Sequence, residues 1–162
     1  MQITIRWQKP IQLTRGKKII IDPKDIPKSI ENVPGVYFFA RTFGKSIILP
    51  FYVGETLTIR TRLKSHLEST KIADVLRGIS DEEAIKNGTK YFHYGYLHGN
   101  AERKLTKRRL SIVQKHLIRL AIETGAPILN YQLTTMKTHS LEFIGSASAR
   151  AIYAKSSAVE AK

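Results

Sequence analysis

The first part of the chain shows patterns typical of β-strands. Residues 2–8 alternate apolar and polar side chains, which predicts a strand with Trp7 and two isoleucines on one face. A turn at 15–17 leads to a second apolar stretch at 18–21, so we expect the two stretches to pair as an N-terminal hairpin. Residues 22–34 contain three prolines and are expected to form a connector.

Two further runs are rich in aromatic and β-branched residues. They occupy 35–40 and 48–54, and the polar, glycine-containing loop between them predicts a β-hairpin. Pro50 has no N–H group, so its strand should begin near that residue or lie at the edge of a sheet. A third run of the same kind, at 90–97, adds another strand.

Helical periodicity is found between and after these runs. Ile59, Leu63 and Leu67 recur every four residues within 56–70, which predicts a helix with one buried stripe. A weaker helical pattern covers 72–88 and ends at an Asn-Gly pair.

The longest predicted helix runs from about residue 101 to 124, and Gly125 ends it. Residues 126–133 are expected to return to the core, and the small, polar stretch from Ser146 is expected to fray. The apolar stripe of the long helix consists of Leu110, Val113, Leu117 and Leu120.

These elements predict an α+β fold. We expect a small antiparallel or mixed β-sheet, with a three-stranded core plus the N-terminal hairpin, flanked by helices. The domain organisation that follows is an N-terminal hairpin extension at 1–33, one compact domain at 34–133 and a C-terminal extension or tail at 134–162.

The composition narrows the class of protein. The 162 residues are 42% hydrophobic and 25% charged, which is typical of a globular domain and excludes a fully disordered or fibrous chain. No apolar run approaches the roughly 18 to 20 residues that cross a bilayer, and the start lacks a signal-peptide pattern. We therefore expect a cytoplasmic protein with no membrane partner. There is no cysteine, which excludes disulfides and thiolate nucleophiles.

The charge balance favours a polyanionic partner. Lys and Arg number 27 against 13 Asp and Glu, which gives a formal net charge of +14 and a pI near 10.1. The basic residues are spread along the chain instead of along one amphipathic segment, which favours nucleic acid over a membrane surface. A basic, solvated surface without a partner is the alternative.

The most specific pattern joins two tripeptides to the following helix. GVY at 35–37 and YVG at 52–54 lie on the two strands of the central hairpin, and Arg62 comes ten residues after the second Tyr. His66 is one helical turn beyond Arg62, and the long helix is followed by a proline and Asn130. In this order and at these spacings, the pattern resembles the GIY-YIG nuclease family over most of the chain.

The resemblance implies a GIY-YIG-like domain acting as a metal-dependent DNA endonuclease. It implies Tyr37 as base or base relay, Arg62 as phosphate clamp, and Tyr52 and His66 as positioning or proton-relay groups. Mg²⁺ or Mn²⁺ would be the cofactor. A tyrosine serves as base only if cations lower its pKa, and we expect this of Arg62 together with a metal.

Each of these residues also has an ordinary explanation. Taken singly, Tyr37 and Tyr52 fit core aromatic residues, and His66 fits a hydrogen-bonding residue on a helix surface. The residues expected to support the site structurally are Gly35, Gly54 and Asn130. For Gly54 the conformational and the functional explanation both hold, and Asn130 fits either a residue that pins backbone near the site or an ordinary loop residue.

The sequence departs from the family at its acidic metal ligand. The family has Glu three residues before a Leu-Ile pair on the last helix, and here Gln114 stands at that position. A neutral amide is a poorer ligand for a hard cation than a carboxylate, so we expect the chain to be weakened or inactive as it stands. An introduced carboxylate-to-amide change and a naturally weakened relative both explain Gln114. The alternative carboxylates, Glu123 and Glu102, fit surface charges better.

Basic residues on two helices are candidates for contacts with nucleic acid. They would neutralise backbone phosphates with little dependence on sequence. Cutting both strands of a duplex with one site per chain would favour a homodimer. The candidate residues are Arg60, Lys64, Arg103, Lys104, Lys107, Arg108 and Arg109.

Three functional hypotheses follow for the chain. The first is a restriction-type or phage-associated endonuclease acting on double-stranded DNA. The second is a catalytically silent nucleic-acid-binding module on the same scaffold, and residue 114 discriminates between these two. The third is an RNA-directed protein with stacking faces for unpaired bases. Those faces would be Tyr91, Phe92, Tyr94 and Tyr96.

Overall fold

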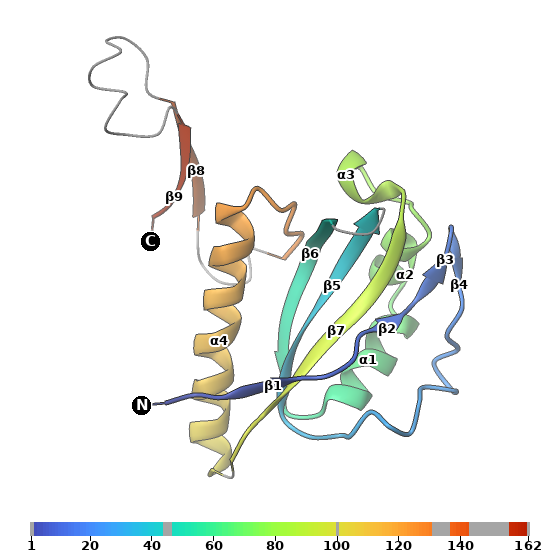
Figure 1. Cartoon of the computed structure of the whole chain (residues 1–162), viewed down its shortest axis with the longest axis vertical. Helices are drawn as coiled ribbons and strands as arrows, with labels where there is room; N and C mark the ends of the chain where they lie inside the picture. Colours follow the sequence, from blue (N-terminus) through green and yellow to red (C-terminus); the bar gives the residue numbers. More distant parts are fainter. Residues whose placement is uncertain (1, 44–46, 100, 131–136, 143–155, 162) are drawn as a thin grey trace.

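The chain folds around one five-stranded antiparallel sheet with helices packed on both faces (Figure 1). The computed structural model describes residues 2–43, 47–99, 101–130, 137–142 and 156–161. The α+β architecture predicted from the sequence is observed. The strands are β1 (Ile5–Trp7), β2 (Ile11–Gln12), β3 (Thr14–Arg15), β4 (Lys18–Ile19), β5 (Gly35–Phe43), β6 (Ile47–Thr56), β7 (Thr89–Leu97), β8 (Lys137–Glu142) and β9 (Ser156–Ala161). The helices are α1 (Ile59–Glu68), α2 (Thr70–Leu76), α3 (Glu83–Lys86) and α4 (Arg103–Glu123).

The central hairpin occupies one side of the sheet. The strand order is β1–β7–β5–β6, and β2 also pairs with β7. β5 and β6 form the hairpin that their composition predicts, with Tyr37 opposite Gly54. β6 is the edge strand, which agrees with the missing N–H group of Pro50.

The N-terminal segment differs from the predicted hairpin. β1 and β2 both pair with β7 and so belong to the main sheet, with Trp7 opposite Gly95. The hairpin is formed instead by β3 and β4 around Gly16, whose φ of 59° suits a glycine. The reason lies at Gly95, where a side chain would collide with Ile5 and Trp7, so its absence allows β1 to pack closely on β7.

The helices begin and end near the predicted residues. α1 buries Ile59, Leu63 and Leu67, which confirms the predicted stripe. The pattern at 72–88 corresponds to two short helices, α2 and α3, instead of one. α4 ends two residues before Gly125, which adopts a φ of 76°. Among the described residues, no helix has both the length and the apolar character needed to cross a bilayer.

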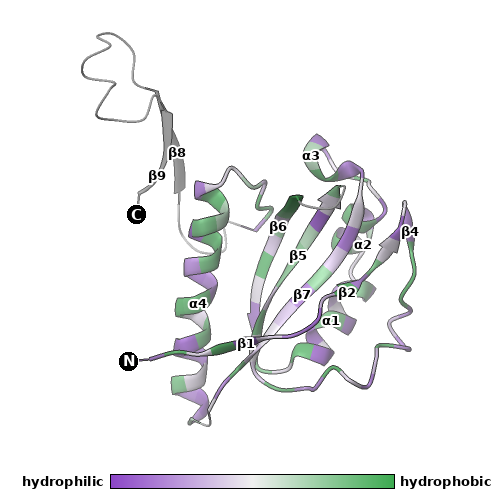
Figure 2. Ribbon diagram, viewed as in Figure 1, coloured by the Kyte–Doolittle hydropathy of each residue, from purple (hydrophilic) through white to green (hydrophobic). Residues whose placement is uncertain are grey.

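The buried face of α4 differs from the predicted stripe. Leu110 is buried as expected, but Leu120 is 42% exposed, and Ile118 and Ala121 pack against the sheet instead. Apolar residues occur on more than one side of α4 (Figure 2), so the repeat alone does not select the face that meets the sheet. The small side chain of Ala121 lets the helix approach β6 closely.

Two apolar clusters hold the helices against the two faces of the sheet. The larger cluster lies between the sheet and α1, α2 and the connector, and the aromatic residues of the sheet form much of it. The smaller cluster lies between the sheet and α4, and its members are Val53, Ile118, Ala121, Ala126 and Ile128. β6 is therefore covered on both faces, while in the described part of the chain no strand pairs with its outer edge.

The C-terminal segment contains a further pair of strands. β8 and β9 are antiparallel, with Lys137 opposite Ala161. Residues 156–161 are thus a strand where fraying was predicted. Residues 131–133 and 143–155, which belong to the segments predicted to enter the core and to fray, lie outside the described residues.

Lys90 is a charged residue in the interior of the fold. It lies on β7 and is 1% exposed. Its ammonium group donates hydrogen bonds to the carbonyl oxygens of Lys86 and Gly88, each at 3.1 Å. Burial lowers the pKa of Lys90 below its ordinary value. Lys90 thereby fastens the end of α3 to the sheet.

We expect Lys90→Met to reduce the free energy of unfolding by about 1–3 kcal/mol, because the two carbonyl oxygens lose their donor. Chemical denaturation measures the change. Lys9→Met, at an exposed position, is the control and should stay within about 0.5 kcal/mol of the wild type. A Lys90→Met variant as stable as the wild type would contradict this role.

Candidate active site at the edge of the sheet

Tyr37 is the centre of the candidate site. It lies near the start of β5, fully buried, on the face of the sheet that carries α1. Its partner across the hairpin is Gly54, and a Cβ atom on Gly54 would collide with the Tyr37 ring and hydroxyl group. The ring therefore lies directly on the backbone of β6. Gly35 is constrained too, because a Cβ there would collide with the carbonyl oxygen of Gly95.

The hydroxyl group of Tyr37 joins two residues of α1. Arg62 Nε donates to the Tyr37 oxygen at 3.1 Å, and this oxygen lies 2.7 Å from His66 Nε2. A guanidinium group has no acceptor, so the Tyr37 proton is free to point at His66. His66 then accepts through Nε2 and carries its own proton on Nδ1. The three side chains form a directed chain of hydrogen bonds from Arg62 through Tyr37 to His66.

Burial sets the protonation states of this chain. Burial raises the pKa of Tyr37 above its ordinary value, although the hydrogen bond and charge of Arg62 act in the opposite direction. Arg62 thus lowers the pKa of Tyr37 as expected, but in the free protein the effect of burial is larger. Burial and the charge of Arg62 lower the pKa of His66 to about 4. Near neutral pH the site thus holds a protonated Tyr37, a neutral His66 and a charged Arg62.

Tyr52 completes the group on the same face of the sheet. Its ring is stacked with that of Tyr37 at a centroid distance of 6.4 Å and lies 5.1 Å from the His66 ring. The register of β5 with β6 shifts here, because Phe39 faces Tyr52 while the next residue of β5 faces Pro50. The resulting β-bulge is of the kind found beside functional sites. The structure thus brings together Tyr37, Tyr52, Arg62 and His66.

Asn130 and Gln114 lie along the backbone of the edge strand. The Asn130 side chain donates to the Val53 carbonyl oxygen at 2.6 Å and accepts from the Val53 N–H at 3.1 Å. This is the arrangement expected of a residue that pins backbone near the site. Gln114 Nε2 donates to the same carbonyl oxygen at 3.2 Å. Both side chains therefore serve to hold β6 in place.

The residues present do not fit a metal held at position 114. The Gln114 amide is occupied as a hydrogen-bond donor to backbone, and it brings no negative charge to a hard cation. In the described part of the chain, no three His, Asp or Glu side chains are grouped closely enough to hold an ion. Gln114 lies on the sheet side of α4, beside Val53, and forms no hydrogen bond with Tyr37.

Comparison with known proteins was made at three levels. No family model, no curated protein and no solved structure matches the chain. The case for a function consequently rests on the residues of the site themselves.

Glu55 belongs to the site, although the sequence pattern did not single it out. It follows Gly54 on β6 and is half-buried. Burial raises the pKa of Glu55, and the nearby charges of Lys107 and Arg62 oppose this increase. Its position directly after the second tripeptide was the one signal that could have identified it.

The basic residues predicted to contact nucleic acid lie on different sides of α1 and α4. Lys107 is next to the site, because its charge acts on Glu55. Arg60 and Lys64 lie on the side of α1 turned away from Arg62, where Arg60 donates to a backbone carbonyl oxygen of the connector. On α4, at 100° per residue, Arg103 lies on the same side as Lys107 and Gln114. The other three, Lys104, Arg108 and Arg109, lie about 100° to 140° around the helix from Arg103, with Arg109 on the opposite side from the other two.

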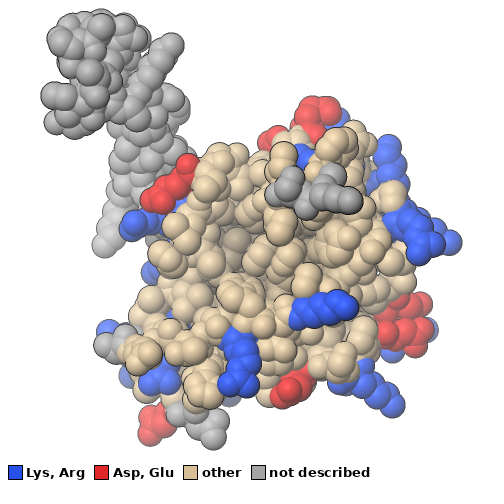
Figure 3. All heavy atoms as spheres, viewed as in Figure 1, with Lys and Arg blue, Asp and Glu red and all other residues tan. Residues whose placement is uncertain are grey.

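The view in Figure 3 shows no single basic patch. On this face the Lys and Arg side chains are scattered among uncharged residues, both at the margin and over the lower half.

The aromatic residues proposed as stacking faces for RNA are mainly structural. Phe92 is fully buried and Tyr94 is 6% exposed. The hydroxyl oxygen of Tyr96 accepts a hydrogen bond from the Glu31 N–H at 2.7 Å, which fixes its ring against the connector. Tyr91 alone of the four is half-buried without such a fixed role. This arrangement leaves little aromatic surface for unpaired bases.

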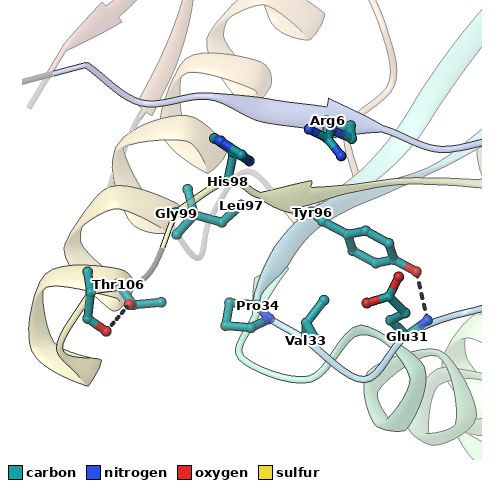
Figure 4. A pocket seen from close by; sticks show the side chains of 10 residues that line it. Arg6, Glu31, Val33, Pro34, Tyr96, Leu97, His98, Gly99 and Thr106 are labelled. Atoms are coloured by element: carbon teal, nitrogen blue, oxygen red, sulfur yellow. Dashed lines mark hydrogen bonds between the residues drawn. The ribbon is translucent and has the colours of Figure 1, made fainter.

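A separate cavity of about 420 Å³ lies between β1, the end of β7 and the start of α4 (Figure 4). Its lining is mixed in charge, and it includes no member of the Tyr37 group. The cavity is therefore distinct from the candidate active site. Among the lining residues are Arg6, Glu31, Pro34, Tyr96, His98 and Thr106.

We expect acidification to weaken the fold through His66. Its pKa is about 4 in the fold, whereas an unperturbed histidine titrates near 6.5. Between these values the unfolded chain binds more protons than the folded one, so the free energy of unfolding decreases as the pH falls from about 6.5 to about 4.

Denaturant unfolding at several pH values measures this effect. His66→Gln keeps an acceptor for Tyr37 but does not titrate, so the variant should lose much of the pH dependence. His98→Gln, at an exposed position, is the matched control and should retain it. An identical pH dependence in the wild type and in His66→Gln would contradict a buried, neutral His66.

Proposed function

We propose that the protein is a DNA endonuclease with a GIY-YIG-like domain, in which residues of β5, β6 and α1 hydrolyse a phosphodiester bond. The observation that carries this proposal is the hydrogen-bond chain from Arg62 through Tyr37 to neutral His66. A phenol placed between a fixed cation and a proton acceptor is suited to activating a water beside a phosphate.

Arg62 is the phosphate clamp in this proposal. Its Nε is bonded to Tyr37, and among the described residues no carboxylate forms an ion pair with it. The guanidinium fork matches two phosphate oxygens, and its charge stabilises the negative charge that develops on them. Arg62 therefore places the phosphorus atom next to the Tyr37 hydroxyl group.

Tyr37 and His66 move the proton of the attacking water. The water proton passes to the Tyr37 oxygen while the Tyr37 proton passes to His66 Nε2, so that no free phenolate is needed. The water oxygen forms its bond to phosphorus, and the bond from phosphorus to the leaving oxygen breaks. The leaving oxygen takes a proton from solvent, and His66 later returns its proton to solvent. The negative charge gained at phosphorus offsets the cost of a cationic His66 in a buried position.

Double-stranded DNA is the proposed substrate, bound along β6 and the first half of α4. The net charge of +14 supports a polyanionic partner, and Lys107 and Arg103 extend the positive charge of Arg62 along α4. Each chain has one such site, so cutting both strands favours a homodimer.

A binding module without catalysis is the second candidate. It is favoured by one observation, the amide of Gln114 at the position where the resemblance implies a metal-binding carboxylate. Such a module would bind DNA through the same cations and would leave it intact.

Cleavage of supercoiled plasmid in the presence of Mg²⁺ or Mn²⁺ tests the proposal. Arg62→Ala should lower the rate by roughly 10²-fold or more, because it removes the group that stabilises charge on the phosphate. Arg60→Ala is the control, since it removes the same charge on the opposite side of α1 and should leave most of the rate.

Two other results would decide against this assignment. Equal rates for wild type and Arg62→Ala would contradict the proposed site. Salt-sensitive DNA binding without cleavage by the wild type would identify the binding module instead.

A further inference from the structure

Glu55 lies on the edge strand β6, directly after Gly54 of the candidate site. It is opposite Val36 in the register of β5 and β6, one residue beyond the pair of Tyr37 and Gly54. Alternation along the strand puts Glu55 on the same face as Val53, which packs against α4. The Tyr37 ring lies on Gly54 from the other face. Only the thickness of the edge strand therefore separates Glu55 from the Tyr37 hydroxyl group.

Three charged or titratable groups surround this carboxylate. The charges of Lys107 on α4 and Arg62 on α1 lower the pKa of Glu55, and the charge of Glu55 raises the pKa of Tyr37. Within the described residues, the Glu55 carboxylate nevertheless has no hydrogen bond and no ion pair. A half-buried carboxylate without a direct partner costs free energy. It is the kind of group that is expected at a functional site.

The hydrogen bonds of two side-chain amides explain why position 114 is suited to glutamine and not to glutamate. Gln114 Nε2 and the Asn130 amide both donate to the Val53 carbonyl oxygen. A glutamate at 114 would have no proton to donate and would bring a negative oxygen towards that carbonyl. The amide at position 114 is thus matched to its place beside β6.

We propose that Glu55 is the acidic residue of this site and that, together with a phosphate oxygen of bound nucleic acid, it binds a divalent cation. One carboxylate is sufficient, because Mg²⁺ keeps several waters and is commonly held by one or two carboxylates plus substrate phosphates. This inference rests on the proposed nuclease function and specifies its metal site.

Binding of Mn²⁺ to the full chain tests the inference without reference to activity. The free ion is followed by its electron paramagnetic resonance signal, with the protein alone and with a short DNA duplex. Glu55→Gln should weaken the tightest Mn²⁺ site by roughly tenfold or more, since loss of even an outer-sphere partner costs about that much. Glu55→Gln has the same shape and breaks no hydrogen bond, so its melting temperature serves to verify that it folds.

Two further variants make the test specific. Glu68→Gln removes the same charge from an exposed position on α1 and should bind Mn²⁺ as the wild type does. Gln114→Glu should give no comparable gain in Mn²⁺ affinity. Mn²⁺ binding that is the same in the wild type and in Glu55→Gln, or restored to high affinity only by Gln114→Glu, would overturn the inference.

The inference and the nuclease proposal fail in different ways. If Glu55→Gln loses Mn²⁺ while neither wild type nor variant cleaves DNA, the cation site stands and the catalytic proposal falls. If Arg62→Ala abolishes cleavage while Glu55→Gln alters neither cleavage nor Mn²⁺ binding, the nuclease stands and Glu55 is not its acidic residue.

Discussion

The close contact between the Tyr37 ring and the Gly54 backbone constrains the rest of the site. The ring can lie flat on β6 only because position 54 has no side chain and because the register places these two residues opposite each other. Arg62 and His66, four residues apart on one helix face, then meet the same oxygen.

The edge strand β6 serves the site from both of its faces. One face presents Tyr52 beside Tyr37, and the other presents Glu55 towards Lys107 on α4. An edge strand normally has free backbone groups that invite pairing with another chain. Here the side-chain amides of Gln114 and Asn130 form hydrogen bonds with the backbone N–H and carbonyl groups of Val53. The same strand can therefore be accessible to a phosphate and still be held at a fixed position.

The sequence predicted those features that depend on local spacing. The stripe of α1, the hairpin of β5 and β6 and the meeting of Arg62 with His66 all follow from periods of four and two residues. The place of β1 could not be predicted, because it depends on Gly95, which is distant in the sequence. The predicted stripe of α4 holds for Leu110 and Leu117 but not for Leu120, because apolar residues lie on several sides of this helix. The net increase in the pKa of Tyr37 could not be predicted, because burial, a property of the folded chain, outweighs the effect of Arg62.

The state of His66 tests the account most directly, because the direction of the hydrogen-bond chain depends on it. Nitrogen-15 NMR of the imidazole ring, with His66→Gln to assign the signal, reports which ring nitrogen carries the proton and the pH at which the ring titrates. The account predicts a neutral ring near pH 7 with its proton on Nδ1 and a titration midpoint at about 4. A proton on Nε2, or a midpoint near the ordinary value of about 6.5, would contradict it.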